Sequence, residues 1–364
     1  MAWPNLRRWL DADRLLFGGL VVAVVVAFPP MASLAPWHQS FATYVHAIIL
    51  QAFPYLVLGA LLAGLIERFL PASFLPDLTR RLGRFGILGT IALAPAVPVC
   101  ECGVLPVARS LMGKGLPLPH TIAFLLAAPI LNPTVLLTTW LAFGQDLEMT
   151  VLRAAGAVVV ALSVGLVATR LNPRRILRPD AAAELLKVAP AITIGRLGGL
   201  VPTSFAKRRP LTGAVRTTGT PVPQTGTTVR QAVAGLGHQV VAHFLDMAGY
   251  FLIGVFIAAG MKTFISGSTL SQVGDGVVTG PLAMMATAFV LSLCAEVDAF
   301  LAVSFTEFSR HSQLAFLVFG PMFDIKLLLM YRRVFSLGAL VGLTILLTLL
   351  TLGWSLLALF LVGR

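Results

Sequence analysis

The chain has 364 residues, of which 57% are hydrophobic and 12% are charged, and its mean hydropathy is +0.89. Soluble domains carry about 25% charged residues, so this composition excludes a soluble globular protein and indicates an integral membrane protein. The net charge of +12 does not indicate a nucleic-acid-binding protein. The basic residues stand between apolar segments, as the positive-inside rule predicts for membrane proteins.

The N-terminal part, residues 1–40, is predicted to form one extra transmembrane helix ahead of the main fold. Its apolar run, residues 15–35, follows Arg7, Arg8 and Arg14. A cleaved signal peptide has a similar pattern, but the length of this run and the many later spans favour an uncleaved helix.

Residues 41–171 form the next apolar region, and the sequence Pro-Val-Cys-Glu-Cys-Gly at residues 98–103 interrupts it. The interruption divides residues 85–113 into two halves, each too short to cross about 30 Å of hydrocarbon as a helix. Basic residues flank both ends. We therefore predict a re-entrant hairpin that opens to the inside, followed by a span broken at residues 128–133.

Residues 172–232 read as a basic cytoplasmic linker, because they contain a Lys-Arg-Arg run and a Thr/Gly/Pro-rich stretch at residues 211–228. Residues 233–364 resume the apolar pattern. A second polar interruption falls within residues 281–308, which we predict to be a second re-entrant hairpin. A further break at residues 320–326 divides the following apolar run.

The two apolar regions align with each other at a shift of about 195 residues. Together with the distribution of basic residues, this predicts an inverted-topology repeat with broken helices, a transporter signature. In that topology all but five of the 27 Lys and Arg fall on the inner side. The matched positions include Gly59 with Gly254, Cys100 with Cys294, Pro129 with Pro321 and Asn132 with Asp324, and the five basic exceptions are Arg153, Lys262, Arg310, Lys326 and Arg364.

The Cys100-Glu101-Cys102 motif is the first candidate for substrate binding. In a non-helical turn the two thiols can face one solute, and thiols select soft partners such as As(III), Cu(I) or Zn(II). They would be metal ligands only if the substrate is a soft metal or metalloid. The spacing differs from that of structural zinc sites. The alternative is that each cysteine serves as a small apolar residue.

The second candidate is acidic and contains Cys294, Glu296 and Asp298. Carboxylates near the middle of a membrane can bind a cation, carry protons or pair with a basic residue. Lys326 is a natural partner for either of them or for Asp324. The alternative is that the two acids are solvated at the mouth of the hairpin.

The helix breaks add Asn132 and Asp324, which can cap the following half-helices. His243 and Asp246 lie three residues apart on one predicted helix face, where they form either a proton relay or a structural hydrogen bond. The predicted substrate site comprises Cys100, Glu101, Cys102, Asn132, Cys294, Glu296, Asp298, Asp324 and Lys326, and the proton-coupling candidates are His243, Asp246, Glu296 and Asp298.

Four of these motifs, at residues 97–103, 126–133, 294–300 and 320–326, resemble the predicted-permease family that contains the YraQ-like and ArsP-type proteins. The resemblance implies a bacterial cytoplasmic-membrane permease, and ArsP-type members export trivalent organoarsenicals. Glu101 stands where the family motif has a small residue such as Ser, which admits a cationic metal. The repeat and the cysteine pair are also similar to the YeeE-type thiosulfate importers.

The sequence thus predicts an all-α polytopic membrane protein with seven full spans and two re-entrant hairpins. We expect a secondary transporter for a small thiophilic solute, with trivalent arsenical efflux as one case. Import of a sulfur-containing anion or a divalent metal is the alternative, and a membrane enzyme with Cys100 as nucleophile is less favoured. We expect a multi-pass inner-membrane protein with a cytoplasmic N-terminus and an external C-terminus, partners limited to solute and lipid, no nucleic acid and no resident cofactor; oligomerisation is left open.

Overall fold

The computed structural model describes residues 36–70, 75, 79, 85–97, 99–171, 176–178, 244, 249, 251–261, 276–332 and 334–362. Within these residues the regular structure is helical, apart from an isolated bridge between Leu177 and Phe335. The predicted all-α class is confirmed. Most of residues 1–40 and of the linker 172–232, together with His243 and Asp246, lie outside the described residues.

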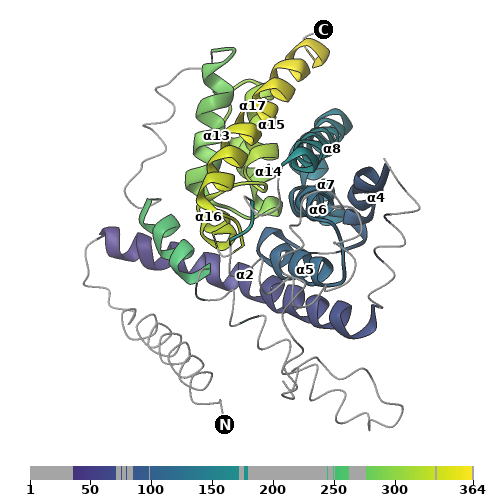
Figure 1. The fold of residues 1–364 in the computed structure, drawn as a ribbon. Coiled ribbons are helices and arrows are strands. Elements are labelled where there is room, and N and C mark those ends of the chain that lie inside the picture. The colour runs from purple at the N-terminus through teal and green to yellow at the C-terminus, as the bar shows by residue number, and fades with distance from the viewer. Residues whose placement is uncertain are drawn as a thin grey trace, which may run out of the picture.

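The first half of the fold begins with the long helix α2 (Pro36–Phe69), which packs lengthwise against α5 (Figure 1). The elements that follow are α4 (Gly86–Leu93), the 3-10 turn η2 (Ala94–Ala96), α5 (Glu101–Gly113), α6 (Leu118–Leu131), α7 (Pro133–Ala142) and α8 (Leu147–Arg170). The axes of α6 and α7 differ by 42° at Asn132. Proline at the first position of α7 explains this break, because its ring fixes the backbone to start a new helix.

The second half presents the same order of elements. A helical segment at Phe251–Met261 is followed by α13 (Thr279–Leu291), α14 (Ala295–Ser304), α15 (Arg310–Phe319), α16 (Ile325–Tyr331) and α17 (Leu337–Val362). In each half a cysteine precedes the helix after the first break, α5 or α14, and Asn132 or Asp324 precedes the helix after the later break. The recurrence agrees with the alignment of the two halves, while their opposite orientation in a membrane stays a prediction.

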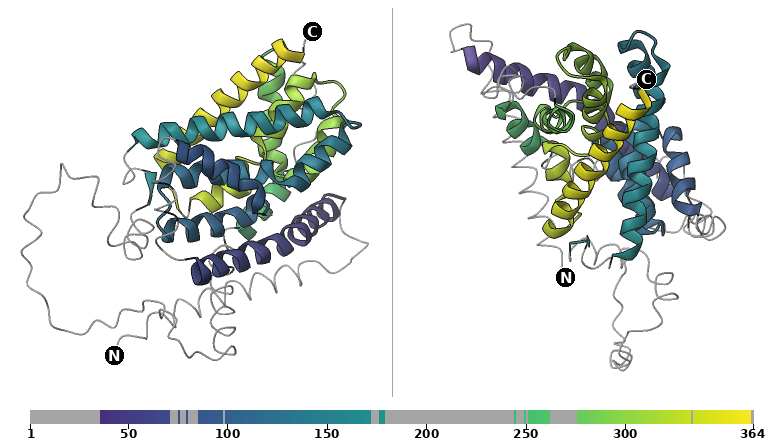
Figure 2. Two further views of the ribbon diagram at one scale, coloured as in Figure 1. Left: turned by 90° about the vertical axis from the view of Figure 1, so that its right-hand side faces the viewer. Right: turned by 90° about the horizontal axis from the view of Figure 1, so that it is seen from above.

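The two halves meet through the short helices that follow the breaks. Helix α5 contacts α16, and α7 contacts α14, so each half contributes one helix to each pairing. Helix α8 also packs against α15 and α17. Figures 1 and 2 show α2 and α17 on opposite sides of the helical body, with the broken segments between them.

Three described helices are long and apolar enough to cross a membrane: Ser40–Ile66, Leu147–Arg170 and Leu337–Leu361. The bent pair α6–α7 makes a fourth if it counts as one span. Large apolar side chains such as Leu50 (80% exposed) and Phe360 (78% exposed) point outward from α2 and α17, as lipid-facing side chains do. The chain is therefore a polytopic α-helical membrane protein, and the count of seven spans and two hairpins stays a prediction.

Candidate functional site

Four helix N-termini lie together in the interior, one from each break. Their N-cap residues are Cys100 for α5, Asn132 for α7, Cys294 for α14 and Asp324 for α16. The side chain of Asn132 accepts from the backbone N–H of Thr134, and that of Asp324 accepts from Leu327. Helix N-termini carry partial positive charge, so the centre of the fold favours anionic and thiolate side chains.

In each half, a side chain from the later helix break donates a hydrogen bond to the backbone of the earlier break. Asn132 Nδ2 donates to the carbonyl of Val99 at 3.4 Å, and Lys326 Nζ donates to the carbonyl of Leu293 at 3.4 Å. Val99 and Leu293 each directly precede the capping cysteine of their half. In both halves this hydrogen bond therefore fixes the position of the peptide before the cysteine.

Cys100, Glu101 and Cys294 form the central cluster of the candidate site. One sulfur or oxygen atom from each lies within 4.8 Å of the other two. The Cys294 thiol donates to Glu296 Oε2 at 2.8 Å and lies 3.6 Å from Glu101 Oε2. All three side chains are buried, so the two cysteine motifs, one from each half of the chain, contribute to a single cluster.

Cys102 lies beside this cluster rather than completing it. Its side chain interacts with the thiol of Cys100, and it is 1% exposed. Cys102 lies in the first turn of α5 rather than in the non-helical turn that was predicted, so a solute site made by Cys100 and Cys102 stays a prediction. The cysteine that the structure groups with Cys100 and Glu101 is Cys294, from the opposite half of the chain.

Lys326 supplies a buried positive charge to the cluster. Its Nζ lies 3.1 Å from Glu101 Oε1 and 3.3 Å from Asp324 Oδ2. Lys326 is 2% exposed, and both carboxylate residues are 1% exposed. The expected partnership with Asp324 is present, and the pairing with Glu101 was not anticipated. Among the described residues, Lys326 forms no ion pair within 4.0 Å of Glu296 or Asp298, its other expected partners.

Arg153 is a second buried cation and one of the five basic residues that the predicted topology left off the inner side. It is 0% exposed within the protein, a position that the sequence did not predict. It reaches from α8 to Thr139 Oγ1 on α7 at 2.6 Å and to the Ala295 carbonyl on α14 at 3.2 Å. An arginine six residues into an apolar helix is itself a signal, since ionisable residues inside membrane spans are costly.

The described site holds more acidic than basic side chains. Glu101, Glu296, Asp298 and Asp324 face two cations, Lys326 and Arg153. Glu296 Oε1 and Asp298 Oδ2 are buried and have no hydrogen-bond partner. Because an unpaired buried carboxylate is costly, this excess of acids favours a site that takes up a cation or protons.

Two glycines that the repeat alignment matches allow the backbones around the site to approach closely. A Cβ atom on Gly59 of α2 would lie 2.6 Å from Gly103 Cα on α5. A Cβ atom on Gly254 would lie 2.9 Å from the Cα of Lys326. Contacts this short leave no room for any side chain, so each glycine fixes the distance between its helix and a segment that carries a site residue.

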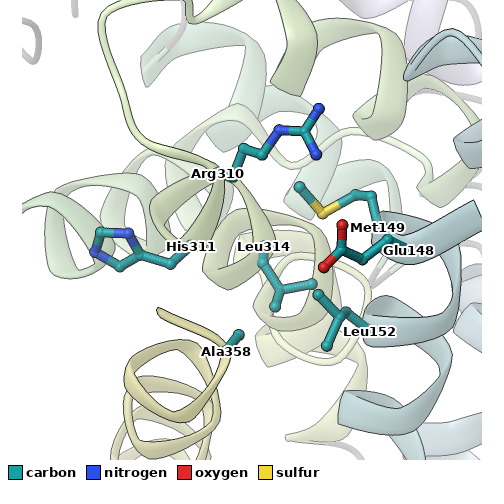
Figure 3. A pocket seen from close by; sticks show the side chains of 7 residues that line it. All are labelled: Glu148, Met149, Leu152, Arg310, His311, Leu314 and Ala358. Carbon is teal, nitrogen blue, oxygen red and sulfur yellow. The ribbon is translucent and has the colours of Figure 1, made fainter. Parts of the chain in front are cut away.

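A small pocket lies apart from this cluster, between the N-terminal ends of α8 and α15 (Figure 3). Glu148 and Met149 line it from α8, and Arg310 and Leu314 line it from α15. Its free space of about 10 Å³ accommodates at most about one water molecule. None of its lining residues belongs to the thiol and carboxylate cluster, so it is not a candidate for solute binding.

Comparison with known proteins places the chain among permeases. Residues 37–360 match the family model described as a predicted permease, ArsP_1. The UPF0718 protein YcgR of Bacillus subtilis is 34% identical over 292 residues, which cover 80% of this chain and 87% of that protein.

Of two further relatives, one is similar to most of the chain and the other to a part of it. A protein of Streptococcus mutans named as a putative two-component membrane permease complex subunit is 31% identical over 295 residues, covering 80% of this chain and 85% of its own. The UPF0718 protein YraQ of Escherichia coli is 31% identical over 140 residues, covering 37% and 39% of the two chains. No solved structure matches the chain.

Proposed function

Because this chain belongs to the ArsP_1 family of predicted permeases, we propose that it is a secondary transporter for a small thiophilic solute, bound between Cys100, Glu101 and Cys294. The observation that carries the proposal is the mutual approach of these three side chains to within 4.8 Å. They come from breaks in both halves of the chain, as transporter sites do. Cys102 and Glu296 border the same site.

Thiol exchange supports a trivalent arsenical as the cargo. An arsenical held by two small thiols in the cytosol can transfer to Cys100 and Cys294: two As–S bonds to the carrier thiols break, two form to the cysteines, and the cysteine protons pass to the departing thiols. Soft thiol ligands suit this cargo. Because the exchange neither adds nor removes net charge, it suits a buried site.

A soft divalent cation is the second candidate, and the excess of carboxylates is the observation that favours it. The unpartnered Oε1 of Glu296 is a further oxygen ligand beside the thiols. The same excess disfavours a sulfur-containing anion, because four carboxylates, three of them on buried residues, repel it.

An enzyme with Cys100 as nucleophile has less support, since no histidine among the described residues hydrogen-bonds to Cys100. We propose that the chain lies in the bacterial inner membrane with its linker in the cytoplasm. In keeping with the name of the S. mutans relative, we propose that it works with a second subunit.

The proposal is tested by transport assays in cells that produce the wild type, Cys100→Ser, Cys294→Ser or Cys102→Ser, with protein amounts in the membrane matched. Each is challenged with a trivalent arsenical and, separately, with Cd(II). We expect Cys100→Ser and Cys294→Ser to abolish transport and Cys102→Ser to reduce it less. Unchanged transport of both solutes by the first two variants would exclude a thiol-ligand site.

A further inference from the structure

We propose that Lys326 is an internal counter-ion of the solute site, which selects uncharged thiophilic solutes over metal cations. This inference deepens the proposed function and rests on it. In the solute-free site the Lys326 ammonium is paired with the Glu101 carboxylate. A cationic solute that binds Glu101 therefore has to displace the ammonium. An uncharged arsenical that exchanges onto the two thiols does not.

Lys326 is held by groups from three different segments. Its Nζ donates hydrogen bonds to Glu101 Oε1 on α5 at 3.1 Å and to the Leu293 carbonyl before α14 at 3.4 Å. It also forms an ion pair with Asp324 Oδ2 at the start of α16 at 3.3 Å. With Lys326 2% exposed, no bulk water competes for these positions, and the ammonium occupies them as a bound cation would.

Glu101 is shared between Lys326 and the thiols. Its Oε1 pairs with Lys326, while its Oε2 lies 3.6 Å from the sulfur of Cys294. A metal cation bound by Cys100, Cys294 and Glu101 would therefore lie next to the Lys326 ammonium. Like charges at such separations repel strongly in a buried site, so the cation binds only as Lys326 leaves Glu101 and stays paired with Asp324.

The same pair joins the two halves of the chain. Glu101 belongs to the first half and Lys326 to the second, 225 positions further along the sequence. A cation that displaces Lys326 replaces a direct link between the halves with a link through the solute. An uncharged solute leaves the direct link in place.

The experiment measures binding of Cd(II) and of a trivalent aryl arsenical to the purified full-length protein, each against a competing small dithiol. The variants are Lys326→Gln, which removes the charge and keeps an N–H donor, and Lys326→Arg, which keeps the charge. Arg310→Gln is the matched control, since it removes an exposed cation that pairs with Asp146 outside the site. Close charge pairs in buried sites change affinity by tenfold or more.

We expect Lys326→Gln to tighten Cd(II) binding by about tenfold or more and to change arsenical binding by less than about threefold. Lys326→Arg keeps the charge and should therefore tighten Cd(II) binding less than Lys326→Gln does, and Arg310→Gln should bind both probes as the wild type does. In a Glu101→Gln background the effect of Lys326→Gln on Cd(II) should disappear, because the shared carboxylate is gone.

Cd(II) binding that is unchanged in Lys326→Gln, or an equal change for both probes, would overturn the inference. If Lys326→Gln does not fold, Asp324→Asn tests the same point with the opposite sign. It removes the charge of the second carboxylate that pairs with Lys326, so Lys326 should leave Glu101 less easily and Cd(II) binding should weaken. Unchanged or tighter Cd(II) binding would refute the proposal. Failure of the thiol site itself is distinguished by Cys100→Ser and Cys294→Ser, which would then bind both probes like the wild type.

Discussion

Replacing Arg153 by methionine removes a buried charge while keeping a side chain of similar length. In the native structure the guanidinium is fully buried and joins α8 to α7 and α14 through Thr139 and the Ala295 carbonyl. Thr139 Oγ1 also donates to the Val135 carbonyl at 2.7 Å, so it keeps a partner in the variant. In the variant the Ala295 carbonyl loses the guanidinium donor, and the nearby carboxylates lose a counter-charge.

The expected loss of stability follows from these contacts. A hydrogen bond from a charged group contributes about 1.5–3 kcal/mol, and breaking a buried charged arrangement by removing one member costs about 3–5 kcal/mol. We therefore expect Arg153→Met to lower the free energy of unfolding by about 3–5 kcal/mol. Arg153→Lys should lose less, because it keeps the charge but not the forked geometry that reaches two acceptors.

The measurement is chemical unfolding of the purified protein in detergent, with Arg310→Met as the control. Arg310 pairs with Asp146 at the surface, where its side chain is 55% exposed, and exposed ion pairs contribute about 0–1 kcal/mol. A folded Arg153→Met protein whose stability is within about 1 kcal/mol of both the wild type and Arg310→Met would refute the assignment of Arg153 as a structural bridge between the halves.

Two further predictions concern the packing and capping around the site. Gly59→Ala should destabilise the protein by about 1–3 kcal/mol through overpacking and reduce transport, because the added Cβ meets Gly103 on α5. Gly260→Ala is its control: the nearest atom to its Cβ is Phe41 Cε2 at 3.9 Å, so thermal unfolding should show a gain of up to about 1 kcal/mol. Asn132→Ser should keep the cap of α7, with stability within about 1 kcal/mol of the wild type, yet slow transport, because it loses the bond to the Val99 carbonyl. Transport at the wild-type rate would contradict a role for that bond.

The sequence was sufficient for features that depend on neighbouring residues. Apolar runs interrupted by Pro, Gly and polar side chains predicted helices broken at residues 98–103 and 128–133, and the structure has breaks there. Capping acts over two or three residues, so Asn132 and Asp324 could be predicted as N-caps from their place before the next apolar run. The alignment of the halves also predicted that Cys100 and Cys294 hold equivalent positions.

The partners across the site depended on tertiary packing. Lys326 could have paired with any of several carboxylates, and only the contact between α5 and α16 brings Glu101 to it over 225 positions. The grouping of Cys100 with Cys294 likewise requires that the two breaks meet.

Arg153 shows most clearly what could not be predicted from the sequence. A basic residue near the end of an apolar span looks the same in sequence whether it reaches the membrane surface or lies inside the protein. Its place inside follows from the approach of α7 and α14 to α8, with Ala295 142 positions further along the chain. Local propensities and capping determine where these helices begin and end. The distances between their charges are set by helix packing, which depends on side chains far apart in the sequence.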